Sequence, residues 1–332
     1  MAWKPLKQTS LADALLIEHS ALTELDGILT LINWHAIEKN LADLHTSKRG
    51  ERAYPPMMMF KALLLQVWYN LSDPALEQQL ARDLLFRRFV GLSLNQAVPD
   101  HSSLWRFRQL ISQEGRLERL LTQLNRQLSE AGLLIRNGQI SIIDASVIEA
   151  QRNRPNKGVA GQHTQDPEAG YNVKASSDGK QKTTYGFKAH VNVEEDGFIN
   201  TLHISAGNVH DSQHFEALLT GHEQAVYADS AYASAKHEAH LALQGIVSCI
   251  LKRAYRNTPL TAADKHQNQI NSGTRSIVER VFGVLKLHYG MAKARYLGLA
   301  RNHARLMLMA MAYNLKRGLA IQKACQSPLA VG

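Results

Sequence analysis

The chain has 332 residues, 45% of them hydrophobic, enough for a full core and suggesting two domains or one domain with an elaborated flank. Its apolar runs are shorter than the roughly 18 residues of a membrane span, the N-terminus has no apolar signal segment, and two cysteines cannot form a disulfide framework. We therefore expect neither membrane insertion nor secretion, but a cytoplasmic protein.

The net charge of +9 is concentrated at the C-terminal end. Nine Lys or Arg and no Asp or Glu lie in residues 280–332, so the whole excess follows Glu279. Such a basic region usually binds a polyanion, most often nucleic acid. A charge that serves only solubility is the alternative.

Residues 1–135 predict an all-helical N-terminal domain. Four segments carry helical patterns, and the second is capped by Ser72: "PPMMMFKALLLQVWYNL", "ALEQQLARDLLFRRFVGL", "PDHSSLWRFRQLISQEG" and "RLERLLTQLNRQLSEAG". The third segment places Arg106 and Arg108 on a short helix. Two interpretations stay open there: a DNA-recognition helix, or a helix packed inside the bundle.

Residues 136–320 predict a second domain with a mixed sheet covered by helices, followed by a tail over 321–332. A β-branched run, "QISIIDASVIEA", indicates the first strand, and the polar segment 151–182 indicates a long loop. A hairpin follows around Asp196-Gly197, and then the order helix, strand, helix, strand, helix. We expect α/β architecture with catalytic groups at strand ends and on the helices that face them.

The first strand of this hairpin, "TTYGFKAHVNVEE", alternates between polar and apolar residues. Lys188 and His190 therefore share one face with Asn192. That face borders either the active site or bound DNA in one interpretation, and it is a solvated sheet face in the other.

Three acidic residues of this domain lie in apolar surroundings. Asp144 lies inside "ISIIDASVI", Asp229 ends "AVYAD", and Glu279 lies on the helix "RSIVERVFGVLK" with Arg275 before it and Lys286 after it. A backbone-bonded core aspartate, a helix cap and a solvated salt bridge to Arg275 are the respective structural explanations. Metal ligation is the functional one, because a buried carboxylate needs a compensating partner.

Carboxylates are the ligands that Mg²⁺ prefers, and paired ions serve phosphodiester chemistry. With a basic region nearby, the pattern favours metal-dependent chemistry on DNA.

In this order, Asp144, Asp229 and Glu279 resemble the acidic triad of bacterial insertion-sequence DDE transposases, which have an RNase H-like fold. "RSIVERVFGVLK" is similar to their Arg, Glu, Lys signature, "YADSAY" and "IIDASVIEA" are similar to the blocks around their aspartates, and the helical segment from "YPPMMMFK" resembles insertion-sequence family five. The resemblance covers residues 45–317. One position departs from it: Ser272 stands where relatives often have Tyr.

The resemblance implies cleavage of transposon ends and transfer of the 3′-hydroxyl strand to target DNA. Asp144, Asp229 and Glu279 would hold two Mg²⁺ ions, with Mn²⁺ as a substitute, while Arg275 and Lys286 would contact the DNA backbone. The expected partners are terminal inverted repeats, target DNA and a second copy of the chain. The helical domain over residues 1–135 would bind the DNA ends, mediate dimerisation, or both. Two alternatives are an RNase H-like nuclease without strand transfer and a catalytically silent repressor.

Overall fold

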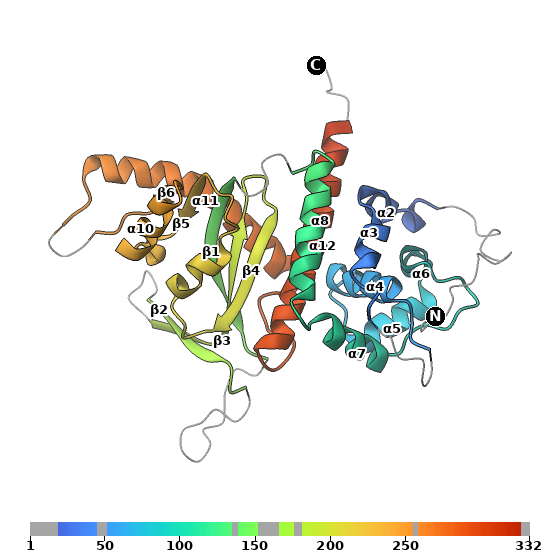
Figure 1. Cartoon of the computed structure of the whole chain (residues 1–332). Coiled ribbons are helices and arrows are strands. Elements are labelled where there is room, and N and C mark those ends of the chain that lie inside the picture. Colours follow the sequence, from blue (N-terminus) through green and yellow to red (C-terminus); the bar gives the residue numbers. More distant parts are fainter. Residues whose placement is uncertain are drawn as a thin grey trace, which may run out of the picture. The chain divides into compact units, whose positions relative to one another are not determined.

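The computed structural model divides the chain into two compact units. One comprises Met1–Leu133 with Leu308–Gly332, and the other comprises Leu134–Met307 (Figure 1). The structure describes residues 19–44, 52–134, 139–151, 166–175, 181–254 and 258–326.

The first unit is helical. Its elements are η1 (Ser20–Leu22), α2 (Asp26–Leu31), α3 (Trp34–Lys39), α4 (Pro56–Trp68), α5 (Asp73–Arg82), α6 (Leu84–Val90), α7 (His101–Ile111), α8 (Arg116–Glu130) and most of α12 (Leu299–Gln326). Buried Leu, Met and Phe side chains from these helices form the core. The predicted helical character of this region is confirmed.

Side-chain caps explain where these helices begin. Ser72 accepts a hydrogen bond from the Ala75 amide at the start of α5, as predicted, and Asp100 caps α7 in the same way. The single helix expected over "ALEQQLARDLLFRRFVGL" is a pair, because Asp83 leaves the helical conformation and caps α6. A residue with a local hydrogen-bonding alternative thus interrupts an otherwise continuous apolar pattern.

The second unit is built on a six-stranded sheet. Its elements are β1 (Ile140–Glu149), β2 (Gly170–Ala175), β3 (Gln181–Val193), β4 (Ile199–Ala206), η2 (Asp211–His214), α9 (Phe215–Leu218), β5 (Ala225–Ala228), η3 (Ser230–Tyr232), α10 (Ala235–Leu243), β6 (Val247–Ile250), α11 (Ala262–His288) and the start of α12. This α/β architecture is the predicted RNase H-like fold.

The sheet is mixed. Its order is β2-β3-β1-β5-β6, with β4 also paired to β3. β1, β5 and β6 run parallel, whereas β2, β3, β4 and β1 are connected by antiparallel pairs. The predicted hairpin turn is present between β3 and β4, where Gly197 has a φ of 81°. Helix α11 packs across β1, β3 and β5.

Part of the segment expected as a loop over 151–182 is a strand. β2 pairs along its whole length with the first half of β3, from Gly170↔Gly186 to Ala175↔Gln181. The sequence there has few strand-forming residues, so pairing to a neighbouring strand decides its conformation. Most of the remaining segment, with Arg152, Arg154, Lys157 and Lys180, lies outside the described residues.

Three glycines make the junction of β2, β3 and β4 possible. A Cβ atom on Gly186 would collide with the backbone of Ile148, and one on Gly170 would collide with Asn208. A Cβ on Gly207 would lie 2.5 Å from the carbonyl oxygen of Gly170. The chains approach so closely that a side chain at these positions would displace the backbone.

Two C-terminal features differ from the sequence prediction. The tail expected from residue 321 is still helical as far as Gln326, and α12 beyond Met307 belongs with the helical unit, whereas residues 136–320 were assigned to one domain. At least two of the nine basic residues also have partners inside the protein. Arg305 donates hydrogen bonds to three backbone carbonyls, and Lys316 lies over the Trp68 ring.

None of the described helices combines the length and hydrophobicity needed to cross a membrane.

Candidate active site

Asp144 and Asp229 lie side by side on neighbouring parallel strands. The β1–β5 register pairs Ile143 with Ala228, so the next residue on each strand is one of the two aspartates. Adjacent strands lie about 4.8 Å apart, and side chains in register point to the same face. By this alternation both aspartates point to the face that α11 covers.

The Asp144 carboxyl is strongly perturbed. Burial raises its pKa to about 6, and the charge of Asp229 contributes in the same direction. Arg275 and a hydrogen bond from the Ala145 amide oppose the shift. The protein therefore compensates the charge of Asp144 only in part, and a cation between the two carboxylates would supply what is missing.

Asp229 begins the turn after β5. Its Oδ1 accepts a hydrogen bond from the Ser230 amide at 2.6 Å, so the capping role considered from the sequence is present. The charge of Asp229 also raises the pKa of the Asp144 carboxyl. Asp229 therefore caps the turn and at the same time interacts with Asp144.

Arg275 faces inward and not toward solvent. Thr261 caps the 27-residue helix α11, whose buried face includes Val278, Phe282 and the Arg275 guanidinium. An Arg275 Nη2 atom lies 3.5 Å from Asp144 Oδ2, a distance typical of a loose ion pair. Its Nε atom is buried and makes no hydrogen bond within the described part of the chain. The solvated-face alternative is therefore wrong for Arg275.

Glu279 lies one helical turn beyond Arg275 and is exposed. Over the described ranges, no group of three or more His, Cys, Asp or Glu side chains is close enough to hold a metal ion. The structure thus brings Asp144 and Asp229 together with Arg275, and it leaves Glu279 outside joint ligand distance. Convergence of all three carboxylates stays a prediction.

Tyr232, which the sequence analysis did not single out, lies in the apolar core next to the turn that holds Asp229. Its side chain is 1% exposed, and its hydroxyl has no hydrogen-bond partner in the described part of the protein. Burial raises the pKa of this hydroxyl, and the charges of Asp211, Asp144 and Asp229 raise it further. The block "YADSAY" contained it, three residues after Asp229, but an aromatic residue there predicts only packing.

Lys286 is half-buried near the end of α11. Burial lowers the pKa of its ammonium group, Lys174 and Lys182 lower it further, and Asp144 opposes them. Lys286 is therefore within electrostatic reach of Asp144, and its contact with the DNA backbone stays a prediction.

Lys188 and His190 are buried and have partners inside the protein. The Lys188 ammonium donates hydrogen bonds of 2.8 Å to Asp211 and to the Val209 carbonyl, and His190 is completely buried beside Ser205. The solvated-face interpretation is therefore wrong, and a place beside the active site or DNA stays a prediction. The segment η2–α9 covers this strand face and supplies polar partners, which alternation within one strand cannot reveal.

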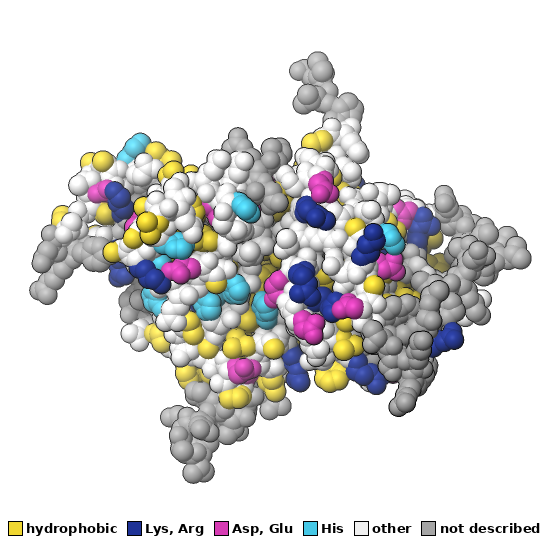
Figure 2. Space-filling model, viewed as in Figure 1, with side chains coloured by type: hydrophobic (Ala, Val, Ile, Leu, Met, Phe, Trp, Pro, Cys, Tyr) yellow, Lys and Arg dark blue, Asp and Glu magenta, His cyan; other side chains and the backbone are white. Residues whose placement is uncertain are grey.

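A row of histidine rings lies on that side of the sheet, and Figure 2 shows histidines gathered over β4 and its neighbours. His190 and His214 stack at 4.4 Å between ring centroids, and His203 lies 6.2 Å from His214. Burial is the main cause that lowers the pKa of His190 to about 3. Burial also lowers the pKa of His214, so the stacked His190 and His214 rings favour the neutral form.

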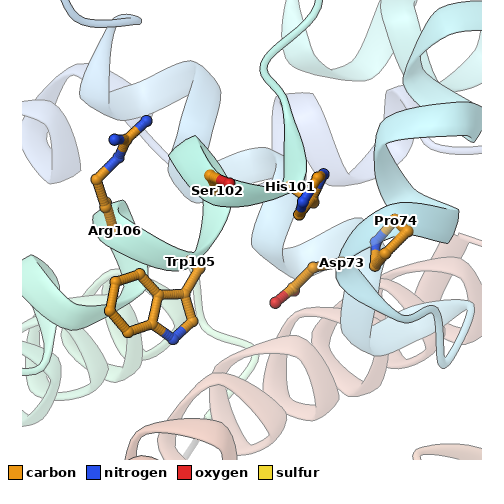
Figure 3. A pocket seen from close by; sticks show the side chains of 6 residues that line it. All are labelled: Asp73, Pro74, His101, Ser102, Trp105 and Arg106. Atoms are coloured by element: carbon orange, nitrogen blue, oxygen red, sulfur yellow. The ribbon is translucent and has the colours of Figure 1, made fainter.

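In the helical unit, the two arginines of α7 have different surroundings. Arg108 is 2% exposed and pairs with Asp73 and Gln66, so its predicted DNA contact is wrong and the bundle-packing alternative holds. Arg106 is exposed. It borders a hollow of about 360 Å³ in which Trp105 and Asp73 face the same space, while Arg106 is directed away from Trp105 (Figure 3).

Two family models match the chain. The transposase domain (DUF772) matches residues 13–110, and the transposase DDE domain matches residues 136–315, more than half of the chain. The chain belongs to the DDE transposase family. It is a DNA transposase, and its enzymatic unit is of the nucleotidyl transferase and endonuclease class. The narrower resemblance to insertion-sequence family five stays a prediction.

The residues of the transposase's sheet unit suit a divalent cation. Two carboxylates on adjacent strands, one with its pKa raised by burial, form an oxygen-rich position whose negative charge Arg275 balances incompletely. DDE transposases generally use divalent metals. Asp144 and Asp229 fit such an ion, and a contribution from Glu279 stays a prediction.

Proposed function

We propose that the transposase cuts the ends of its own element and transfers the 3′-hydroxyl strand to target DNA. The observation that carries this proposal is the pairing of Asp144 with Asp229 on adjacent strands, with a carboxyl pKa of about 6 under a loosely paired Arg275. Asp144, Asp229 and Glu279 would hold two Mg²⁺ ions, for which Mn²⁺ would substitute. When bound, these ions would activate the attacking oxygen and stabilise the leaving one.

The chain's own residues then have separate roles. Arg275 orients Asp144 and limits repulsion between the two aspartates. Lys286 and the exposed Arg106 contact DNA phosphates, and the helical unit binds the element's ends. Two copies act together because two ends are processed, and they do so on bacterial chromosomal DNA.

A product analysis tests this function. The wild-type protein is incubated with Mg²⁺, a plasmid target and a duplex from the inverted repeat that flanks its coding sequence. Joined products are the expected result. Nicks without joining would replace the proposal with a nuclease, and binding without cleavage would replace it with a repressor.

The Asp144→Asn variant is the matched control in that assay. Its amide keeps the shape of the side chain but not the ligand charge, so binding is expected to persist while cleavage is lost. Wild-type cleavage by Asp144→Asn in Mg²⁺ would contradict the assignment.

A further inference from the structure

Three lysines come from three different elements of the sheet unit, and two of them, Lys174 and Lys286, interact electrostatically with Asp144. Lys174 of β2 is directly opposite Lys182 of β3 in the antiparallel register, and both are exposed. The third, Lys286, comes from α11. Lys182 and Lys286 are more than 100 residues apart in the chain. Both nevertheless belong to the same unit, one on a strand and the other on a helix.

These charges interact with one another. After burial, Lys174 and Lys182 are causes that lower the pKa of the Lys286 ammonium, and Lys174 also acts on Asp144. Like charges directly opposite on neighbouring strands destabilise a sheet. The folded protein therefore holds three cations in mutual repulsion, and a polyanion bound among them would relieve it.

Protection of a sheet edge is the structural explanation to be weighed. Lysines on edge strands prevent pairing with other chains, and β2 is at the edge of this sheet. That explanation also extends to Lys182, because its part of β3 is paired only with β2, while β1 and β4 pair with β3 only from Gly186 and Phe187 onward. It does not cover Lys286, which is at a half-buried position on helix α11.

We propose that Lys174, Lys182 and Lys286 form a phosphate clamp, which binds the DNA backbone where it approaches Asp144 and Asp229. The identity of the polyanion as DNA rests on the proposed function. The clamp adds the β2–β3 hairpin to the substrate-binding surface. Because it contacts phosphates, it binds every DNA sequence alike.

The salt dependence of DNA binding tests the clamp. The double variant Lys174→Ala/Lys182→Ala and the wild type are titrated with two short duplexes, one from the flanking inverted repeat and one of random sequence. Fluorescence anisotropy is read without divalent cation from about 50 to 200 mM NaCl. Each lost phosphate contact reduces the slope of log K against log salt by about 0.9, so a reduction of about 1.8 is expected on both duplexes.

The control double variant is Lys236→Ala/Lys265→Ala, which removes the same net charge at exposed positions outside the clamp. Its slope is expected to stay near that of the wild type. Equal reductions in the two double variants, or an unchanged slope in Lys174→Ala/Lys182→Ala, would overturn the clamp.

Folding and function are read separately. Thermal unfolding of the clamp variant should be no lower than that of the wild type, because repulsion is removed. Should the double variant fail to fold, Lys182→Gln alone carries the test with an expected slope reduction of about 0.9. An unchanged salt slope in the double variant, together with normal end cleavage, would contradict the clamp but not the proposed function. Absence of end cleavage by the wild type would contradict the proposed function, and the measured salt slopes would still apply to the clamp.

Discussion

Each unit contains a buried arginine paired with an aspartate, and the two pairs differ in how fully the protein satisfies them. In the helical unit, Arg108 contacts both carboxylate oxygens of Asp73 and also Gln66, with side chains 3% and 17% exposed. In the sheet unit, Arg275 lies 3.5 Å from Asp144, and its buried Nε atom has no partner within the described residues.

This difference separates an ion pair that the protein satisfies fully from one that it satisfies only in part. A buried charge persists at low cost only when its hydrogen bonds are complete. The pair in the helical unit meets that condition. The pair in the sheet unit does not, so its residual negative charge is available to a ligand.

The largest effect on stability is expected at the complete pair. Arg108→Met removes the buried guanidinium that neutralises Asp73 and should reduce the free energy of unfolding by about 3–5 kcal/mol. Urea denaturation followed by circular dichroism measures it. Arg106→Met, on the exposed side of the same helix, should change stability by no more than about 0.5 kcal/mol. Equal effects of the two substitutions would show that Arg108 is not a structural anchor.

The incomplete pair predicts a pH dependence. The folded-state pKa of Asp144, about 6, lies above its ordinary value of 3.8, so the folded state binds the proton more tightly. This contribution to stability is fully present below pH 4 and is lost as pH rises through 6. Its size is about 3 kcal/mol, from about 2 pKa units at 1.36 kcal/mol each.

Unfolding of the metal-free wild type and of Asp144→Asn across this pH range measures the effect. The variant should gain stability relative to the wild type between pH 4 and 6. A constant difference between the two proteins over that range would mean that Asp144 carries an ordinary pKa.

A smaller effect separates two tyrosines, one in each unit. The Tyr54 hydroxyl donates a hydrogen bond of 2.8 Å to the Val98 carbonyl, whereas the buried Tyr232 hydroxyl has no partner within the described chain. Tyr54→Phe should therefore cost about 1 kcal/mol of unfolding free energy. Tyr232→Phe should cost nothing or stabilise the protein slightly, yet slow end cleavage by roughly tenfold.

Thermal or urea unfolding measures the change in unfolding free energy, and a cleavage time course measures the change in cleavage rate. Loss of stability in Tyr232→Phe with unchanged cleavage would reverse the assignment and make Tyr232 a packing residue.

The sequence predicted correctly those features that depend on a single helix, strand or turn. Strand placement of Asp144 and Asp229, the β3–β4 hairpin and the apolar face of α11 all follow from local pattern and turn chemistry. The order of these elements, read with the charges, led to the family that the comparisons confirm.

The local sequence pattern could not predict which side chains from distant segments become ion-pair or hydrogen-bond partners. The periodicity of α11 placed Arg275 beside Glu279 on a polar face, but it could not show that β1 offers Asp144 as a partner. Likewise, alternation along β3 could not show that η2 covers Lys188 and supplies Asp211. Strand β2 depends on pairing with β3 and not on its own composition.

The most direct test of the account concerns Glu279, the carboxylate that lies apart from the other two. End cleavage in Mg²⁺ is compared for the wild type, Glu279→Gln and Glu238→Gln, an exposed glutamate on α10. We predict that Glu279→Gln keeps duplex binding and loses cleavage by at least about 100-fold, while Glu238→Gln cleaves normally. Cleavage by Glu279→Gln at the wild-type rate would contradict a three-carboxylate active site.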